Sequence, residues 1–389
     1  MKWNSIRTKV LAALAGCLAA GVAGTLILLH YSFARNSQAL ATESVNSAQR
    51  LFKILEVREI SKMTAVAETL ALNPEVRDAF AAKDRSRLLQ LTAPLYLKLK
   101  EQDITNWLFH TPEPDMSVFL RLHAPAKFGD RLDRFIDKEV VRTHSIVVGN
   151  ELAKAGFAVR IIRPFYDSHG ELTGYVEFGE EIGRFIREMK GQTGDDYGLL
   201  LSKKFVSRQF WTDTSASLKR RDNWSDHPNF VVADKTSAND NIIRFQGDLA
   251  SLAAQGTALE RFDAGNSVFV RGIFPIFDAA NNTVGAMFVV RDISGTYLSM
   301  RNTQNLLVSV SVVSLLLGAL LVMTLLNRLV FRRLEHIIGV ATRVVGGDYE
   351  SEILVGSRDE IGRFEQLFEQ FRCVFIDLLA NVPEFQERK

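Results

Sequence analysis

The chain has 389 residues, with 47 Lys and Arg against 45 Asp and Glu, so its formal net charge is +2. Hydrophobic residues make up 47% of it. This composition excludes a mainly disordered chain, a collagen-like chain and a disulfide-stapled chain. The small net charge argues against general nucleic-acid binding.

Two runs without Asp, Glu, Lys or Arg lie near opposite ends of the chain. They cover residues 10–34, which is 25 residues, and residues 302–327, which is 26 residues. A helix needs about 20 apolar residues to cross a bilayer, so we predict two transmembrane helices. Three alternatives remain open. The first run is also compatible with a cleaved signal peptide or with a lipoprotein signal at Cys17, and the second with a buried core helix.

Basic residues flank the outer ends of both runs. They are Lys2, Arg7 and Lys9 before the first run, and Arg328, Arg332 and Arg333 after the second. Basic flanks favour the cytoplasmic side of a membrane. We therefore expect both termini in the cytoplasm, including residues 1–9. Residues 35–301, which number 267, would form one extracytoplasmic domain.

Both cysteines, Cys17 and Cys373, lie outside the predicted extracytoplasmic domain, which should therefore fold without disulfides. The sequence contains no cysteine and histidine cluster with zinc-ligand spacing, no phosphate-binding loop, no HExxH and no G-x-S-x-G. We expect no metal site, no catalytic residues, no cofactor and no enzyme activity.

The extracytoplasmic region begins with helical periodicity and continues with strands. A long helix is expected from residue 35 to a boundary at Pro74, and a second helix from there to residue 99. Residues 104–109 and 117–123 then read as the two strands of a hairpin. The second strand would place Val118, Leu120 and Leu122 on one face, and Phe119, Arg121 and His123 on the other.

An internal repeat divides the region into two modules. Residues 157–182 and 268–293 share seven identities at an offset of 111. The identities include the pairs Arg160 with Arg271, Pro164 with Pro275, Asp167 with Asp278, and Gly174 with Gly285. Each copy reads as strand, turn and strand. We predict two related modules in series, a distal module at about 100–190 and a proximal module at about 195–296.

This layout resembles the double Cache sensors of bacterial methyl-accepting chemotaxis proteins and sensor histidine kinases. The segments SVFLRLHAPAKFGD, at 117–130, and GYVEFG, at 174–179, carry the resemblance. It implies an α+β fold in which two transmembrane helices flank a tandem PAS-like ectodomain with a long N-terminal helix. It also implies a multi-pass protein of the bacterial inner membrane, a periplasmic sensor domain and a small ligand in the distal module.

Polar and aromatic residues of the distal module form the candidate ligand site. They are Trp107, His110, Arg121, His123, Lys127, Arg160, Tyr175 and Glu177. Aromatic walls with a few convergent polar groups suit a small polar ligand, and arginine favours an anionic one. Alternatively, Arg121 and His123 lie on a solvated face and pair with Asp130 or Asp133. Arg271 of the proximal module is expected to pair with a neighbouring acid.

Residues 328–378 resemble a HAMP domain, because two amphipathic stripes flank an extended connector that begins after Gly346-Gly347-Asp348. The sequence DEIG opens the second stripe. The proline usual in this family near the start is absent, with Arg333-Leu334 in its place, so the helix is expected to continue from the span. The predicted relay residues are Asp348, Asp359, Glu360 and Gly362. One such helix pair cannot bury both stripes, which predicts a parallel four-helix bundle and a homodimer.

Only 17 residues follow Arg372, including the tail 379–389. We therefore expect a receptor whose output comes from a cytoplasmic partner. Two alternatives stand beside this interpretation. One is an output-less receptor that acts as a regulatory or dominant-negative subunit of a chemoreceptor or sensor kinase. The other is a non-signalling scaffold that serves an enzyme or transporter.

Overall fold

The computed structural model describes residues 6–153, 156–239, 243–354, 356 and 358–380. Parts of two predicted segments, residues 1–5 of the N-terminus and 381–389 of the tail, lie outside the described residues. The chain divides into two compact units. One is Ala34–Leu298, and the other combines the chain up to Phe33 with the chain from Ser299 onward.

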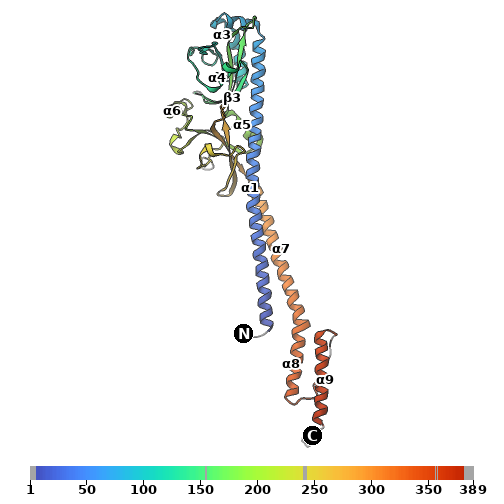
Figure 1. The fold of residues 1–389 in the computed structure, drawn as a ribbon. Helices are drawn as coiled ribbons and strands as arrows, with labels where there is room; N and C mark the ends of the chain where they lie inside the picture. Colours follow the sequence, from blue (N-terminus) through green and yellow to red (C-terminus); the bar gives the residue numbers. More distant parts are fainter. Residues whose placement is uncertain (1–5, 154–155, 240–242, 355, 357, 381–389) are drawn as a thin grey trace. The chain divides into compact units, whose positions relative to one another are not determined.

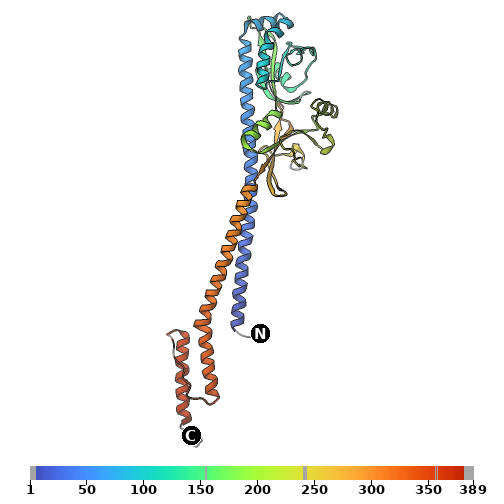
Figure 2. The same cartoon turned by 180° about the vertical axis from the view of Figure 1, so that it is seen from behind.

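Helix α1 (Ile6–Ala71) is a single helix of 66 residues. From residue 45 on it buries one stripe, because apolar side chains recur every three or four positions. The stripe includes Val45, Phe52, Met63, Ala67 and Leu70. Figures 1 and 2 show this part of α1 running along both sheets of the larger unit.

The second predicted helix is in fact two helices, α2 (Pro74–Ala81) and α3 (Arg85–Glu101). Lys83 between them has a positive φ of 54°, which a helix does not allow. Asp84 then starts α3, since its side chain accepts a hydrogen bond from the Arg87 backbone N–H at 2.9 Å. The prediction missed this break, although the polar run at 83–87 interrupts the apolar pattern there.

The distal module is a five-stranded antiparallel sheet in the order β2-β1-β5-β4-β3. Its strands are β1 (Asn106–His110), β2 (Val118–Arg121), β3 (Val147–Ala153), β4 (Gly156–Tyr166) and β5 (Leu172–Glu181). One face packs on α1, α2 and α3 through an aromatic core. The other face is covered by α4 (Phe135–Thr143). Val118, Leu120 and Leu122 are buried, as the alternation predicts.

The proximal module repeats this topology, with the sheet order β7-β6-β10-β9-β8. Its strands are β6 (Asp196–Ser202), β7 (Phe230–Lys235), β8 (Thr257–Ala264), β9 (Ser267–Phe277) and β10 (Thr283–Asp292). Helix α5 (Gly183–Thr193) leads into this sheet, and α6 (Arg208–Ser217) with the short turns η1 (Trp224–Asp226) and η3 (Leu249–Ser251) completes the module. The repeated segments are the hairpins β4–β5 and β9–β10, one in each of the two sheets.

The two repeated glycines allow close strand contact, as the sequence indicates. A Cβ on Gly174 would lie 2.1 Å from the carbonyl oxygen of His110. A Cβ on Gly285 would lie 2.4 Å from the carbonyl oxygen of Leu200. Real Cβ atoms do not approach oxygen this closely, so both positions require glycine.

The smaller unit is helical. Helix α7 (Ser294–Leu326) continues through a π-helical turn, η4 (Asn327–Phe331), into α8 (Arg332–Val345) without interruption, as expected from the missing proline. After α8, Gly347 takes a positive φ of 96°. An extended connector then leads to α9 (Glu360–Ala380), which lies beside α8 (Figure 1). Helices α1 and α7 both contain a stretch long and apolar enough to cross a membrane.

Candidate functional site

A buried carboxylate on β5 is the centre of the candidate site. Glu177 is 0% exposed and receives hydrogen bonds from three side chains. Arg134 donates from both Nη atoms, at 2.9 and 2.6 Å, and Arg160 donates from Nη1 at 2.8 Å. His110 Nε2 lies 2.9 Å from Glu177 Oε2. We call Glu177, Arg134, Arg160 and His110 the Glu177 cluster.

Strand register brings the cluster together on one face of the distal sheet. Glu177 pairs with Leu108 on one side and with Ile162 on the other. His110 and Arg160 are each two residues from one of these partners, so their side chains lie on the same face. This is the face that α4 covers. Arg134 precedes α4 and reaches down from it onto Glu177.

Asp137, in the first turn of α4, holds Arg134 in place. Its carboxylate accepts hydrogen bonds from Arg134 Nε and Nη2, both at 2.8 Å, and from the Arg134 backbone N–H at 3.1 Å. Arg134 therefore bridges two carboxylates. A planar guanidinium presents five N–H donors in a fixed fork, so it can meet each carboxylate with two hydrogen bonds.

The charges of the cluster stabilise one another. Burial alone would raise the pKa of Glu177, but Arg134, the hydrogen bond from His110 and Arg160 lower it well below its usual range. Burial lowers the pKa of Arg160, and the charge of Glu177 opposes that effect. Glu177 is therefore a carboxylate and both arginines are cations near neutral pH.

Two polar atoms of the cluster are unmatched. Arg160 Nε and His110 Nδ1 are buried and have no hydrogen-bond partner among the described residues. His110 faces a carboxylate through Nε2, so Nε2 carries a proton. The cluster thus retains two nitrogens, Arg160 Nε and His110 Nδ1, for hydrogen bonds to a polar molecule on the α4 side of the sheet.

The structure brings some of the predicted site residues together and separates others. His110, Arg160 and Glu177 meet directly. Tyr175 lies on the same face, but its hydroxyl donates to Glu113 at 2.9 Å. Trp107 belongs to the opposite face, where its ring packs 4.9 Å from that of Phe178, so its inclusion in the site was wrong. The reason is geometric: residues three apart in a strand, such as 107 and 110, point to opposite faces.

Arg121 follows the alternative interpretation. It donates from Nη1 and Nη2 to the carboxylate of Asp130, at 2.6 and 2.7 Å, and from Nη1 to the Lys127 carbonyl oxygen at 2.9 Å. Partial desolvation of the ring, with the charges of Arg121 and Arg160, lowers the pKa of His123. His123 is therefore neutral at pH 7. The side chain of Lys127 is exposed.

Arg134 and Asp137 were missed because the sequence interpretation did not recognise α4. The signal was present: a charged pair spaced by three residues opens the amphipathic segment FIDKEVV. In the proximal module, Arg271 pairs with no carboxylate among the described residues. It donates to the backbone oxygen of Glu260 at 3.2 Å and lies over the ring of Phe262, which corrects the expected acid pair.

The predicted relay residues lie where the connector meets α8 and α9. The Asp359 side chain accepts from the Gly362 N–H at 2.8 Å, so it begins α9, and Glu360 is exposed in the first turn. The Asp348 side chain accepts from the Ser351 hydroxyl at 2.7 Å.

An unpredicted arginine joins the two helices. Arg333 forms hydrogen-bonded ion pairs with both Asp359 and Glu365, with closest distances of 2.8 Å. Glu365 also accepts from the Gly356 backbone N–H of the connector at 2.9 Å. The residue that replaces the usual proline therefore holds the starts of α8 and α9 together.

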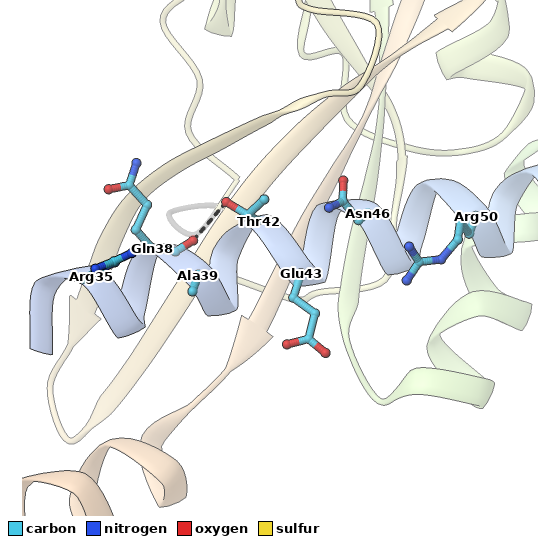
Figure 3. Close-up of a pocket in the computed structure, with 7 residues that line it drawn as sticks. All are labelled: Arg35, Gln38, Ala39, Thr42, Glu43, Asn46 and Arg50. Carbon is cyan, nitrogen blue, oxygen red and sulfur yellow. Dashed lines mark hydrogen bonds between the residues drawn. The ribbon is translucent and has the colours of Figure 1, made fainter. Parts of the chain in front are cut away.

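A shallow surface also runs along α1. Figure 3 shows its seven lining residues, which all come from this helix. They are Arg35, Gln38, Ala39, Thr42, Glu43, Asn46 and Arg50. Six of them are exposed and Asn46 is half-buried. The surface is therefore one polar face of a helix, without a buried polar group.

No three His, Cys, Asp or Glu side chains in the described part of the chain are grouped so that they could hold a metal ion. A search of curated proteins finds no match. Several solved sensor domains are similar in structure. One is the periplasmic domain of Vibrio cholerae LuxQ, at 9% identity and a TM-score of 0.35, covering 67% of this chain and 99% of that one. Another is the sensory domain of the Campylobacter jejuni chemoreceptor Tlp3 with isoleucine bound, at 13% identity and a TM-score of 0.39, covering 69% and 96%.

The family model described as "Double sensory domain of two-component sensor kinase" matches residues 36–227. This range contains the distal module, with the whole Glu177 cluster, and the start of the proximal module. Two helices long and apolar enough to cross a membrane flank the two modules. The two modules therefore form a double Cache sensory domain, and residues 36–227 match the model of the double sensory domain of two-component sensor kinases.

Proposed function

We propose that this chain is a transmembrane receptor of the bacterial inner membrane. Its periplasmic double Cache domain binds a small polar ligand at the Glu177 cluster, and residues 328–378 act as a HAMP domain that relays the change to a cytoplasmic output protein. In this proposal residues 10–34 and 302–327 span the membrane, residues 35–301 are periplasmic, and both termini are cytoplasmic.

The Glu177 cluster is the observation that carries the proposal. Burying charges away from water costs free energy, and well-packed apolar side chains would stabilise the core at least as well. The cluster nevertheless places two guanidiniums, a carboxylate and an imidazole on one face of a sheet, and two of its buried nitrogens have no hydrogen-bond partner among the described residues. Clustered buried charges of this kind are typical of binding sites.

Ligand binding at the cluster would act on α4 and on β5. A ligand carboxylate would compete with Glu177 for Arg134, because the guanidinium of Arg134 is the cluster's connection to α4. Moving Arg134 shifts α4, and moving Glu177 shifts β5, which leads directly into α5 and the proximal module. Such coupling requires that the ligand binds the two states with different affinity.

The helical segment after the second span supports a homodimer. Ile337, Val340 and Ile353 form the small core between α8 and α9. A second stripe on α9 recurs every three or four residues and is left exposed. It comprises Phe364, Leu367, Phe371, Val374 and Leu378, all between 51% and 64% exposed. A second copy in a parallel four-helix bundle would bury this stripe, as a HAMP dimer requires.

The test is ligand screening on the full chain in lipid nanodiscs. Amino acids, organic acids, amines and inorganic anions are added, and the melting temperature is followed. A ligand of the cluster should raise it, and Arg134→Gln should abolish the increase, because the amide cannot bridge two carboxylates. Arg142→Gln, an exposed position on the same helix, is the matched control. Shifts that survive Arg134→Gln would place the ligand elsewhere.

A further inference from the structure

A second cavity lies away from the Glu177 cluster, at the junction of the two modules. It has a volume of 540 Å³ and is formed by α1, β3 and the end of β9 with the turn that follows it. The Ala279 backbone N–H donates to the Asn150 carbonyl oxygen at 3.0 Å, which joins the two modules at this point. A molecule bound there would contact both modules and the helix that continues into the first span.

The polar end of the cavity offers hydrogen-bond acceptors. Glu56 and Asn150 are 6% and 7% exposed. Asn150 Nδ2 donates to Glu56 Oε1 at 2.6 Å and to the Phe277 carbonyl oxygen at 3.2 Å, so both of its hydrogens are used. Asn150 Oδ1 is buried and receives no hydrogen bond from the described residues. An occupant must therefore donate hydrogen bonds here.

The position of Lys53 indicates what kind of donor fits. Its ammonium group is paired with Glu56 Oε2, although the Lys53 side chain is 68% exposed and comes from the same helix. An exposed lysine on a buried carboxylate is a weak, exchangeable partner. A ligand ammonium can take its place and also donate to Asn150 Oδ1.

Most of the remaining wall is apolar, two basic side chains also line the cavity, and Gln49 and Asp278 are its other polar lining residues. Phe52, Ile60, Phe274 and Pro275 line the cavity. Arg50 also lines it, and its side chain is exposed. The lining therefore complements an ammonium group at the buried end and an apolar body behind it. A cavity of this size holds a small metabolite.

We propose that this inter-module cavity binds a small molecule with a primary ammonium group on a compact apolar body. Glu56 and Asn150 Oδ1 would accept its hydrogen bonds. The site is separate from the Glu177 cluster and goes beyond the function proposed above. Two sources share this chemistry, namely simple alkylamines and apolar amino acids. They differ in a carboxylate, which Arg50 and Lys53 at the mouth would receive.

The test measures binding of isoamylamine, L-leucine and isovalerate to the full chain in nanodiscs by calorimetry. Isoamylamine should bind and isovalerate, which lacks the ammonium group, should not. Tighter binding of L-leucine than of isoamylamine identifies the amino acid as the source, and the reverse identifies the amine. Absence of binding by both ammonium compounds, or equal binding of isovalerate, overturns the proposal.

Two variants make the test specific. Glu56→Gln preserves shape and should weaken isoamylamine binding about tenfold or more, the effect of losing a hydrogen bond to a charged group. Lys53→Ala should strengthen it severalfold, since the competing ammonium is gone. A merely structural Glu56–Lys53 pair would not give that gain. Because Lys53 is exposed, this variant keeps the test valid even if Glu56→Gln folds poorly.

Controls come from an equivalent pair and from the other site. Lys98 and Glu101 on α3 have the same spacing and are exposed, so Lys98→Ala and Glu101→Gln should leave binding unchanged. Isoamylamine binding that survives Glu56→Gln but is lost in Arg134→Gln would place the ligand at the Glu177 cluster, which overturns this proposal and leaves the receptor function intact.

Discussion

Glu177 organises the polar face of the distal module. Three cationic or neutral nitrogen donors from β1, β4 and the start of α4 converge on one carboxylate that no water reaches. Burying any one of these charges alone would cost free energy, and the opposite charges around it offset that cost. Removing the central charge should therefore destabilise the fold more than removing any exposed ion pair.

Glu177→Gln should lower the free energy of unfolding by roughly 3 kcal/mol, because Arg160 would remain buried without a counter-charge. Arg160 is only 3% exposed, so water cannot compensate. Denaturant unfolding of the full chain in detergent micelles measures the change. Glu171→Gln, in the exposed turn of the same hairpin, should have almost no effect. Equal stability of the two variants would show that the arginines do not depend on Glu177.

A pair of buried carboxyl groups lies between α1 and the end of β5. Glu59 and Glu180 are 2% and 1% exposed. Burial and the neighbouring Glu59 raise the pKa of Glu180 to about 7. Burial would raise the pKa of Glu59, but its hydrogen bond with Glu180 and its cationic neighbours lower it to about 2. The charged groups around the pair are Arg58, Lys62, Asp103, Arg184 and Glu188.

The Glu180 shift predicts how stability depends on pH. The folded chain keeps a proton on Glu180 up to about pH 7, whereas the unfolded chain releases it near its ordinary pKa of 4.5. Stability from this group is therefore present below about pH 4.5 and is lost as the pH rises to about 7. The stability that Glu59 contributes depends on pH in the opposite direction, because it is lost as the pH falls from about 4.5 toward 2.

Glu180→Gln should accordingly reduce the loss of stability between about pH 4.5 and pH 7, by about 3 kcal/mol at most. Melting temperatures of the full chain across this range measure it. Glu181→Gln, the exposed neighbour, serves as the control and should leave the pH profile unchanged. A Glu180→Gln profile that still declines like that of the unmodified chain would contradict the prediction.

At the scale of elements, the fold depends on where the backbone departs from regular structure. Lys83 with its positive φ separates α2 from α3, and Asp84 begins the new helix. The two hairpins of the repeat depend on glycines that let strands approach within a distance that no side chain permits. Positions of this kind determine the fold, because they decide where helices and strands end and how closely the strands pack.

Gly174→Ala should therefore destabilise the distal module by about 2 kcal/mol or more, since the new Cβ would collide with a backbone oxygen and with the ring of Phe80. Gly285→Ala should have a similar effect on the proximal module. Thermal melting of each variant measures the change. Gly191→Ala, in helix α5 with open space around it, is the control and should be neutral or slightly stabilising. If Gly174→Ala left the melting temperature unchanged, the strands could move apart without a loss of stability, which would contradict the prediction.

At the scale of the whole molecule, the exposed apolar stripe of α9 is the feature that one chain does not explain. The side chains of Phe371 and Leu378 are 64% and 63% exposed, more than a soluble helix face normally leaves to water. Their spacing matches the seam of a helical bundle. In the HAMP dimer proposed above, a second copy of the chain would cover this stripe.

Phe371→Glu should shift the full chain from dimer toward monomer, because two glutamates would face each other in the seam. Mass photometry of the protein in nanodiscs or detergent measures the distribution at several concentrations. Gln370→Glu adds the same charge at an exposed position outside the stripe and should leave the dimer unchanged. A Phe371→Glu chain as dimeric as the control would argue that α9 does not form the seam.

The order of the parts could be predicted from the sequence. Two uncharged runs, a 26-residue repeat at an offset of 111 residues and two amphipathic stripes predicted the spans, the paired modules and the helix pair, and the alternation of 118–122 predicted the buried face of β2. These features are local, because period, charge and turn residues act over short distances along the chain. The missed break at Lys83 shows the limit, because one backbone angle there ends α2.

Which side chains meet depends on how distant segments pack in the folded chain. Arg121 was predicted for the ligand site, yet it pairs with Asp130, whereas Arg134, which was not predicted, reaches Glu177 across 43 positions of sequence. Trp107 and His110 are close in sequence but lie on opposite faces of β1. Glu56 and Asn150 come from different elements and meet only because two modules pack on α1. A binding site depends on sheet register and on packing between distant segments, and a local sequence pattern predicts neither of them.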